Sequence, residues 1–113
     1  MKTILLISFL LICCMPVLKA HSASMVELEY ERETNILKVS FIHKVTNIEE
    51  HFIDEVVVQL NEETIIEQRV NQQENNDGGI FFYKIPGLKS GDKLKAITNC
   101  NRIGKKSAEL EID

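Results

Sequence analysis

Hydrophobic and polar residues alternate in several of seven short apolar segments between residues 26 and 112, and this period of two constrains the fold most strongly. Val26, Leu28 and Tyr30, for example, alternate with Glu27 and Glu29. Such alternation places successive side chains on opposite faces of a β-strand. Turn-forming residues separate the segments, which cover residues 26–30, 37–41, 52–60, 64–70, 80–85, 94–100 and 108–112. Seven short strands predict an all-β fold, an immunoglobulin-like β-sandwich.

The first 20 residues follow a different pattern. Lys2 is followed by an apolar run over residues 4–18, a small residue closes the segment at Ala20, and no acidic residue precedes Glu27. These features predict a signal-peptide helix at 1–20, cleaved after Ala20 or, alternatively, after Ala23. The apolar run is shorter than the roughly 20 residues of a membrane span. We therefore expect an exported domain of residues 21–113, periplasmic or secreted and not membrane-bound after cleavage. The alternative is that residues 1–20 are retained as a membrane anchor.

Cleavage changes both the charge and the cysteine count. Removing Lys2 and Lys19 from the 13 Lys and Arg residues leaves 11 against 17 Asp and Glu, a net charge of about −6. This argues against nucleic acid as a partner, because its phosphates require clustered cations. Of the three cysteines only Cys100 remains, without a disulfide partner in its own chain. The thiol is then buried and inert, paired with another chain, or a metal ligand.

Three residues that can bind a metal lie at predicted strand ends. His43 follows the second strand, His51 precedes the third, and Cys100 ends the sixth. Strand ends of a sandwich gather at two poles, and a hairpin between the second and third strands would bring the two imidazoles together near the thiol. Imidazole and thiolate suit iron, copper or zinc. The alternative is that the histidines are ordinary surface residues and Cys100 a buried thiol beside a turn.

The order of these motifs resembles the iron-binding domain of the superoxide reductase (desulfoferrodoxin) family. The matching parts are the run from His43 to His51 with Phe-Ile after it, an apolar strand, Lys-Ser-Gly-Asp at 89–92, and Cys100-Asn-Arg-Ile-Gly104. The family has a His-Pro-Met segment, a His-Tyr-Ile pair and a late Cys-Asn-x-His-Gly motif. The resemblance covers about residues 36–112 and implies an immunoglobulin-like sandwich.

The resemblance also implies a mononuclear iron site, Fe²⁺ or Fe³⁺, with four imidazoles and an axial thiolate. His43 and His51 would be imidazole ligands and Cys100 the thiolate. Superoxide, or another small ligand, would take the open position and be reduced to peroxide, with electrons from an unidentified redox partner. This sequence departs from the family pattern at three places. Ile103 replaces the histidine of the closing motif, and the loop from His43 to His51 is two residues longer than usual. The family's early Lys-His-Val-Pro segment, which carries another ligand and a catalytic lysine, has no clear counterpart here. His21 is the remaining imidazole that would replace a missing ligand.

His21 supports a second metal hypothesis. After cleavage at Ala20, its free amine and imidazole would chelate copper, with His43 or His51 adding a nitrogen. An interpretation from a different class is a non-catalytic β-sandwich that has lost its metal and binds a protein partner.

Overall fold

The computed structural model describes residues 21–113, which form seven strands and their connections. The predicted signal peptide at 1–20 lies outside the described residues, together with Cys13 and Cys14. Within residues 21–113 there is no helix, and so none long and apolar enough to cross a membrane. All seven predicted strands are present, with ends within three residues of those expected. They are β1 (Met25–Glu31), β2 (Ile36–Ile42), β3 (Ile53–Leu60), β4 (Glu63–Arg69), β5 (Gly78–Lys84), β6 (Lys93–Cys100) and β7 (Lys105–Glu111).

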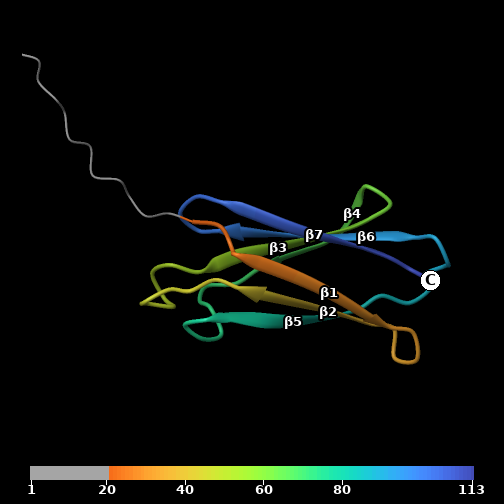
Figure 1. The fold of residues 1–113 in the computed structure, drawn as a ribbon, viewed down its shortest axis with the longest axis horizontal. Helices are drawn as coiled ribbons and strands as arrows, with labels where there is room; N and C mark the ends of the chain where they lie inside the picture. The colour runs from red at the N-terminus through yellow and green to blue at the C-terminus, as the bar shows by residue number, and fades with distance from the viewer. Residues whose placement is uncertain (1–20) are drawn as a thin grey trace, which may run out of the picture.

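The strands form two antiparallel sheets that pack face to face (Figure 1). One sheet has three strands in the order β1-β2-β5, and the other has four in the order β4-β3-β6-β7. β1 lies against β7, so the two sheets meet along this side. The predicted seven-strand β-sandwich is thereby confirmed.

The core fills the space between the sheets with alternate residues of the central strands β2, β3 and β6. Burial of a Val or Leu side chain stabilises a fold by about 1.5–3 kcal/mol. These strands therefore form a rigid frame, and the residues of the candidate site lie at or beside their ends. The core residues with exposed fractions of at most 1% on these strands are Leu37, Val39, Ile53, Val56, Val58, Leu94 and Ala96.

The β3–β4 connection is the tight hairpin predicted at Asn61 and Glu62. Both residues have positive φ, 49° and 71°, as a two-residue turn of the type I′ class requires. The Asn61 side chain accepts a hydrogen bond from the Lys93 backbone N–H (2.9 Å) and donates one to Asp92 (3.0 Å). The hairpin follows the C-terminal end of β3, whereas His51 lies before its N-terminal end.

The connection from β2 to β3 is not a hairpin, and that expectation is wrong because the two strands belong to different sheets. Residues 43–52 instead cross from one sheet to the other. The backbone N–H of His43 donates to Asp77 (2.8 Å) and that of Val45 to Asn76 (2.9 Å), so the crossing pairs with the loop before β5. His43 and His51 still reach the same pole, because the end of β2 and the start of β3 both lie there.

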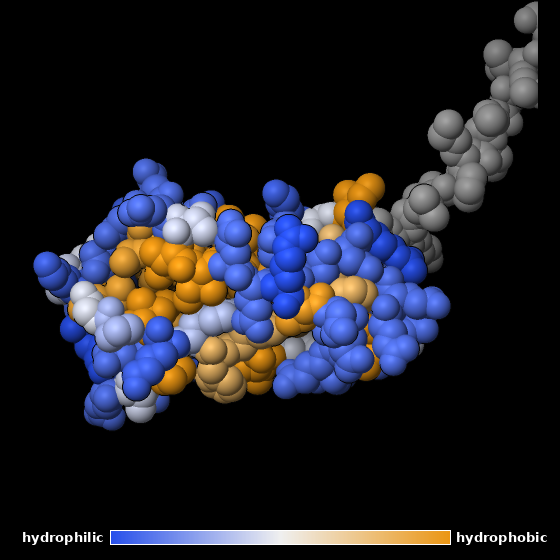
Figure 2. Space-filling view, turned by 180° about the vertical axis from the view of Figure 1, so that it is seen from behind, coloured by the Kyte–Doolittle hydropathy of each residue, from blue (hydrophilic) through white to orange (hydrophobic). Residues whose placement is uncertain are grey.

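Some apolar side chains reach the surface. Figure 2 shows them on the face seen from behind, bordered by hydrophilic residues. Of the three consecutive aromatic residues at 81–83, Phe82 points outward with 64% exposure, whereas Tyr83 is buried.

Candidate metal centre

Four residues that can bind a metal meet at one pole of the sandwich. His43 directly follows β2, His51 lies two residues before β3, and Cys100 is the last residue of β6. His21 comes from the segment before β1. In the β3–β6 pairing Cys100 lies opposite Ile53, which places the thiol beside the start of β3. The pole thus gathers ligand atoms from both sheets.

The three imidazoles form a compact triangle. Their ring centroids are 4.6 Å apart for His21–His43, 4.9 Å for His21–His51 and 4.8 Å for His43–His51. One nitrogen of each ring lies within 4.8 Å of the others. Nitrogen ligands about 2.1 Å from one ion are at most about 4.2 Å apart. Small ring movements would therefore suffice for all three to bind a single ion.

Cys100 is not one of these mutually close ligand atoms and contacts the group through His51. Its Sγ lies 3.2 Å from His51 Nε2, and both residues are buried, each with 8% exposure. A nitrogen and a thiolate bound at about 2.1 and 2.3 Å would lie about 3.1 Å apart if they met the ion at a right angle. The observed distance matches neighbouring ligands of one ion. Without an ion, the same distance lets the thiol and the imidazole share one proton.

His43 is fully buried and contacts Gln73, a residue that the sequence did not single out. Its Nδ1 lies 2.8 Å from Gln73 Oε1, and its Nε2 lies 3.0 Å from the backbone oxygen of His21. Gln73 itself is 1% exposed. It occurs in a polar stretch that reads as a loop, where nothing distinguishes it from its exposed neighbour Gln72.

The segment that carries His21 is fixed against the rest of the pole. Ser24 donates its N–H to Ile42 (2.8 Å), and His21 Nε2 lies 3.1 Å from the Lys44 carbonyl oxygen. Gly104, in the β6–β7 connection, has φ of +132°, and a Cβ there would lie 2.5 Å from the Ser22 nitrogen. The connection that follows Cys100 therefore packs directly on the backbone next to His21.

The electrostatics of the pole favour a neutral His51. Burial, and then the charges of His43, Arg102 and His21, hold the pKa of His51 below its ordinary value. Neutral imidazole is the form that binds metals. Beside these rings is an open hollow of about 400 Å³, lined among others by His21, His51, Lys44 and Arg102. Two cations thus border the exposed side of the imidazole group.

Ile103 does not contribute a ligand. Its side chain is 75% exposed, more than that of any other large hydrophobic residue among those described. The candidate imidazole ligands among the described residues are therefore His21, His43 and His51, of which His51 contacts the thiol. That these residues and Cys100 bind a metal remains a prediction.

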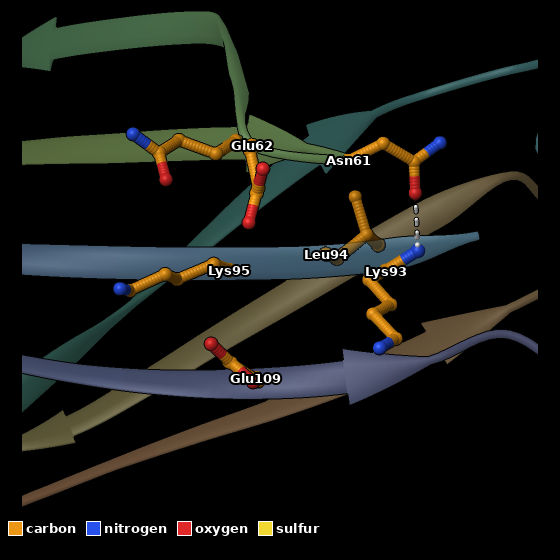
Figure 3. A pocket seen from close by; sticks show the side chains of 7 residues that line it. Asn61, Glu62, Lys93, Leu94, Lys95 and Glu109 are labelled. Atoms are coloured by element: carbon orange, nitrogen blue, oxygen red, sulfur yellow. Dashed lines mark hydrogen bonds between the residues drawn. The ribbon is translucent and has the colours of Figure 1, made fainter.

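A second hollow, of about 440 Å³, lies at the opposite end of β3 (Figure 3). Asn61 and Glu62 of the hairpin line it, together with Lys95 and Glu109 from β6 and β7. Its lining contains neither histidine nor cysteine, and it carries acidic and basic side chains in alternation. Of the two ends of the sandwich, the pole with His21, His43 and His51 is therefore the candidate metal site.

The fold and this group of residues define a class: a β-sandwich domain with a candidate metal centre at one pole. No protein-family model and no curated protein matches the sequence. Solved structures do match. The superoxide reductase (1Fe-SOR) from Giardia intestinalis has a TM-score of 0.60 and 15% identity, over 80% of this chain and 99% of that chain. The superoxide reductase (neelaredoxin) from Ignicoccus hospitalis has a TM-score of 0.51 and 16% identity, over 79% of this chain and 80% of that chain. The predicted resemblance to superoxide reductases is thereby confirmed at the level of the fold.

Proposed function

We propose that this chain is an exported domain that holds one iron ion through His21, His43, His51 and Cys100 and reduces superoxide to hydrogen peroxide. The observation that carries the proposal is the cluster of three imidazoles at one pole, with the Cys100 thiol in contact with His51. The two superoxide reductases that share the fold support it.

The donor set fits a borderline transition metal. Three nitrogens and one sulfur suit iron, copper or zinc, whereas magnesium and calcium require oxygen ligands. The pole also supplies the support that such ligands need. His43 is held by Gln73, and burial lowers the pKa of His51, which favours its neutral form. Iron is favoured within this set because the two solved structures that share the fold are superoxide reductases, one of them described as 1Fe-SOR.

The reaction consumes one superoxide, one electron and two protons and gives one hydrogen peroxide. Iron, when bound, would supply the electron, and an external reductant would restore it. Lys44 and Arg102 line the hollow beside the rings, so their charges would draw the superoxide anion toward the open side. The buried sides of His43 and His51 face the protein and keep those ligands away from water.

We also propose that the domain is exported. Residues 1–20 have the pattern of a signal peptide, and cleavage after Ala20 would leave His21 as the first residue. The domain would then act in the periplasm or outside the cell. Its partners would be superoxide and an unidentified redox partner.

Copper binding is the second candidate, and the place of His21 favours it. The His21 ring lies on the exposed side of the imidazole triangle, so a free amine at the same residue would be next to three imidazole nitrogens. Copper binds nitrogen donors more tightly than iron does. A non-catalytic sandwich without metal remains the alternative from another class.

The test is metal analysis of the domain of residues 21–113, prepared with His21 as its first residue. We expect one iron per chain and a visible thiolate-to-iron absorption band that Cys100→Ser removes. Superoxide pulses should give one peroxide per superoxide consumed, whereas dismutation would give half as much. One copper per chain, lost when residues are added before His21, would favour the second candidate. Absence of any bound metal would reject both.

A further inference from the structure

Asn101 directly follows Cys100 and contacts the chain on both sides of His51. Its side-chain Oδ1 accepts a hydrogen bond from the Phe52 backbone N–H (3.0 Å), and its Nδ2 donates to the Glu50 backbone oxygen (2.9 Å). Its backbone N–H donates to the Phe52 backbone oxygen (2.9 Å). The residue next to the thiol is therefore bound to both chain neighbours of the imidazole that the thiol contacts.

The pairing of β3 with β6 is irregular at this end of the two strands. Ile53 lies opposite Cys100, but the register shifts between Ile53 and Glu55. The N–H groups of Ile53 and Cys100 do not donate to each other, because they donate to Gln73 Oε1 (3.3 Å) and to the Gly104 backbone oxygen (2.9 Å). The strand pairing alone therefore does not fix the start of β3 against the end of β6.

Asn101 supplies the missing link with a side chain that takes the place of a backbone acceptor. Two residues of a hydrogen-bonded antiparallel pair each donate an N–H to the other's backbone oxygen. Between Asn101 and Phe52, one of these two bonds is accepted by Oδ1. The orientation of the amide is determined by its partners, because turning it over would place an NH₂ group against an N–H and an oxygen against the Glu50 oxygen.

We infer that Asn101 is a positioning residue that sets the 3.2 Å separation between Cys100 Sγ and His51 Nε2. The inference rests on the proposed function, because this separation matters when both atoms bind one ion. Asn101 acts mainly through the backbone, since its Oδ1 makes only a long contact of 3.9 Å with Sγ. Loss of a group that orients a ligand typically weakens metal binding by about 10–100-fold.

Two substitutions at position 101 test the role of the side chain. Asn101→Ala removes both side-chain hydrogen bonds, so only the backbone bond to Phe52 remains of the three. Asn101→Asp keeps the acceptor for the Phe52 N–H, but it loses the donor to Glu50 and places an oxygen there instead. We therefore expect Asn101→Asp to lie between the wild type and Asn101→Ala.

Asn61→Ala is the matched control. The Asn61 side chain also accepts from a backbone N–H, that of Lys93 (2.9 Å), and donates to an oxygen of Asp92 (3.0 Å), but it does so in the hairpin at the other end of β3. Because Asn61 has positive φ, which alanine adopts less readily, Asn61→Ala should destabilise the fold at least as much as Asn101→Ala. Denaturant unfolding checks this, so an effect confined to Asn101 is not a general loss of stability.

The separation is read in metal-free protein from nuclear Overhauser effects between the His51 ring protons and the Cys100 β protons. We expect these effects in the wild type and in Asn61→Ala, and a strong decrease in Asn101→Ala. Unchanged effects in Asn101→Ala would overturn the inference, as would an equal decrease in Asn61→Ala. If Asn101→Ala does not fold, Asn101→Asp decides by the same comparison.

Titration with Co²⁺ against a coloured chelator gives the second readout, because a thiolate bound to Co²⁺ produces its own absorption band. We expect Asn101→Ala to bind Co²⁺ about 10–100-fold more weakly than the wild type and to lose intensity in this band, whereas Asn61→Ala should match the wild type. Equal affinity and an equal band in Asn101→Ala and the wild type would reject the positioning role. The proposed function fails separately, if the wild type binds neither Co²⁺ nor Fe²⁺ although the Overhauser effects respond to Asn101→Ala as expected.

Discussion

Replacing Gly104 by alanine tests whether the segment before β1 is part of the metal centre. The new Cβ would lie 2.5 Å from the Ser22 nitrogen and 3.0 Å from the His21 carbonyl carbon. Contacts shorter than 3.0 Å are essentially never made by a Cβ, so the Ser22 backbone must move by at least the missing 0.5 Å. Because Ser22 directly follows His21, a shift of its backbone would displace the His21 ring relative to His43 and His51. We expect metal affinity to fall by about 10–100-fold, as when a group that orients a ligand is lost.

Gly91→Ala is the matched control. Gly91 also has positive φ, +89°, but a Cβ there meets nothing within 4 Å. Both substitutions therefore carry a backbone strain of about 1–3 kcal/mol, and only Gly104→Ala adds the contact with Ser22. Denaturant unfolding measures the stability of the two variants, and competition with a chelator measures their affinity for Fe²⁺ and Zn²⁺. If Gly104→Ala binds metal as tightly as Gly91→Ala, the β6–β7 connection does not position His21.

Three further results are expected. Cys100→Ser should remove the thiolate-to-iron absorption and leave the metal-free fold intact, as judged by circular dichroism; a retained band would show that another group is the sulfur ligand. Lys44→Gln and Arg102→Gln should each slow superoxide consumption several-fold and weaken its dependence on ionic strength, whereas Lys95→Gln, at the far end of the sandwich, should not. Because burial lowers the pKa of His51, the unfolded chain takes up a proton before the folded one as the pH falls. As the pH falls below about 6.5, the stability of the metal-free protein should therefore decrease, and an increase in that range, measured by urea unfolding, would contradict the assigned burial of His51.

Much of the fold was predictable because strands such as β2 and β6 are half-buried and their sequences alternate accordingly. Val56 and Val58 point into the core, and Val57 between them is less buried, as the period of two requires. The hairpin predicted at Asn61 and Glu62 is also present. It was not predictable that β2 and β3 belong to different sheets. Alternation shows which face of a strand is buried, but it does not show which sheet the strand joins.

The candidate site was predictable only in part. His43, His51 and Cys100 could be placed at strand ends, and strand ends of a sandwich meet at its poles. Gln73 could not be found in this way, because its burial and its contact with His43 arise from the packing of the loop before β5 on the residue 43–52 crossing. The backbone contact between Gly104 and Ser22 depends likewise on tertiary packing.

Iron content and visible absorption of the purified domain of residues 21–113 test the central claim most directly. The account predicts one iron per chain and a thiolate-to-iron band that is absent in Cys100→Ser. A protein that binds no iron when grown and purified with excess Fe²⁺, or a band unchanged by Cys100→Ser, would contradict it.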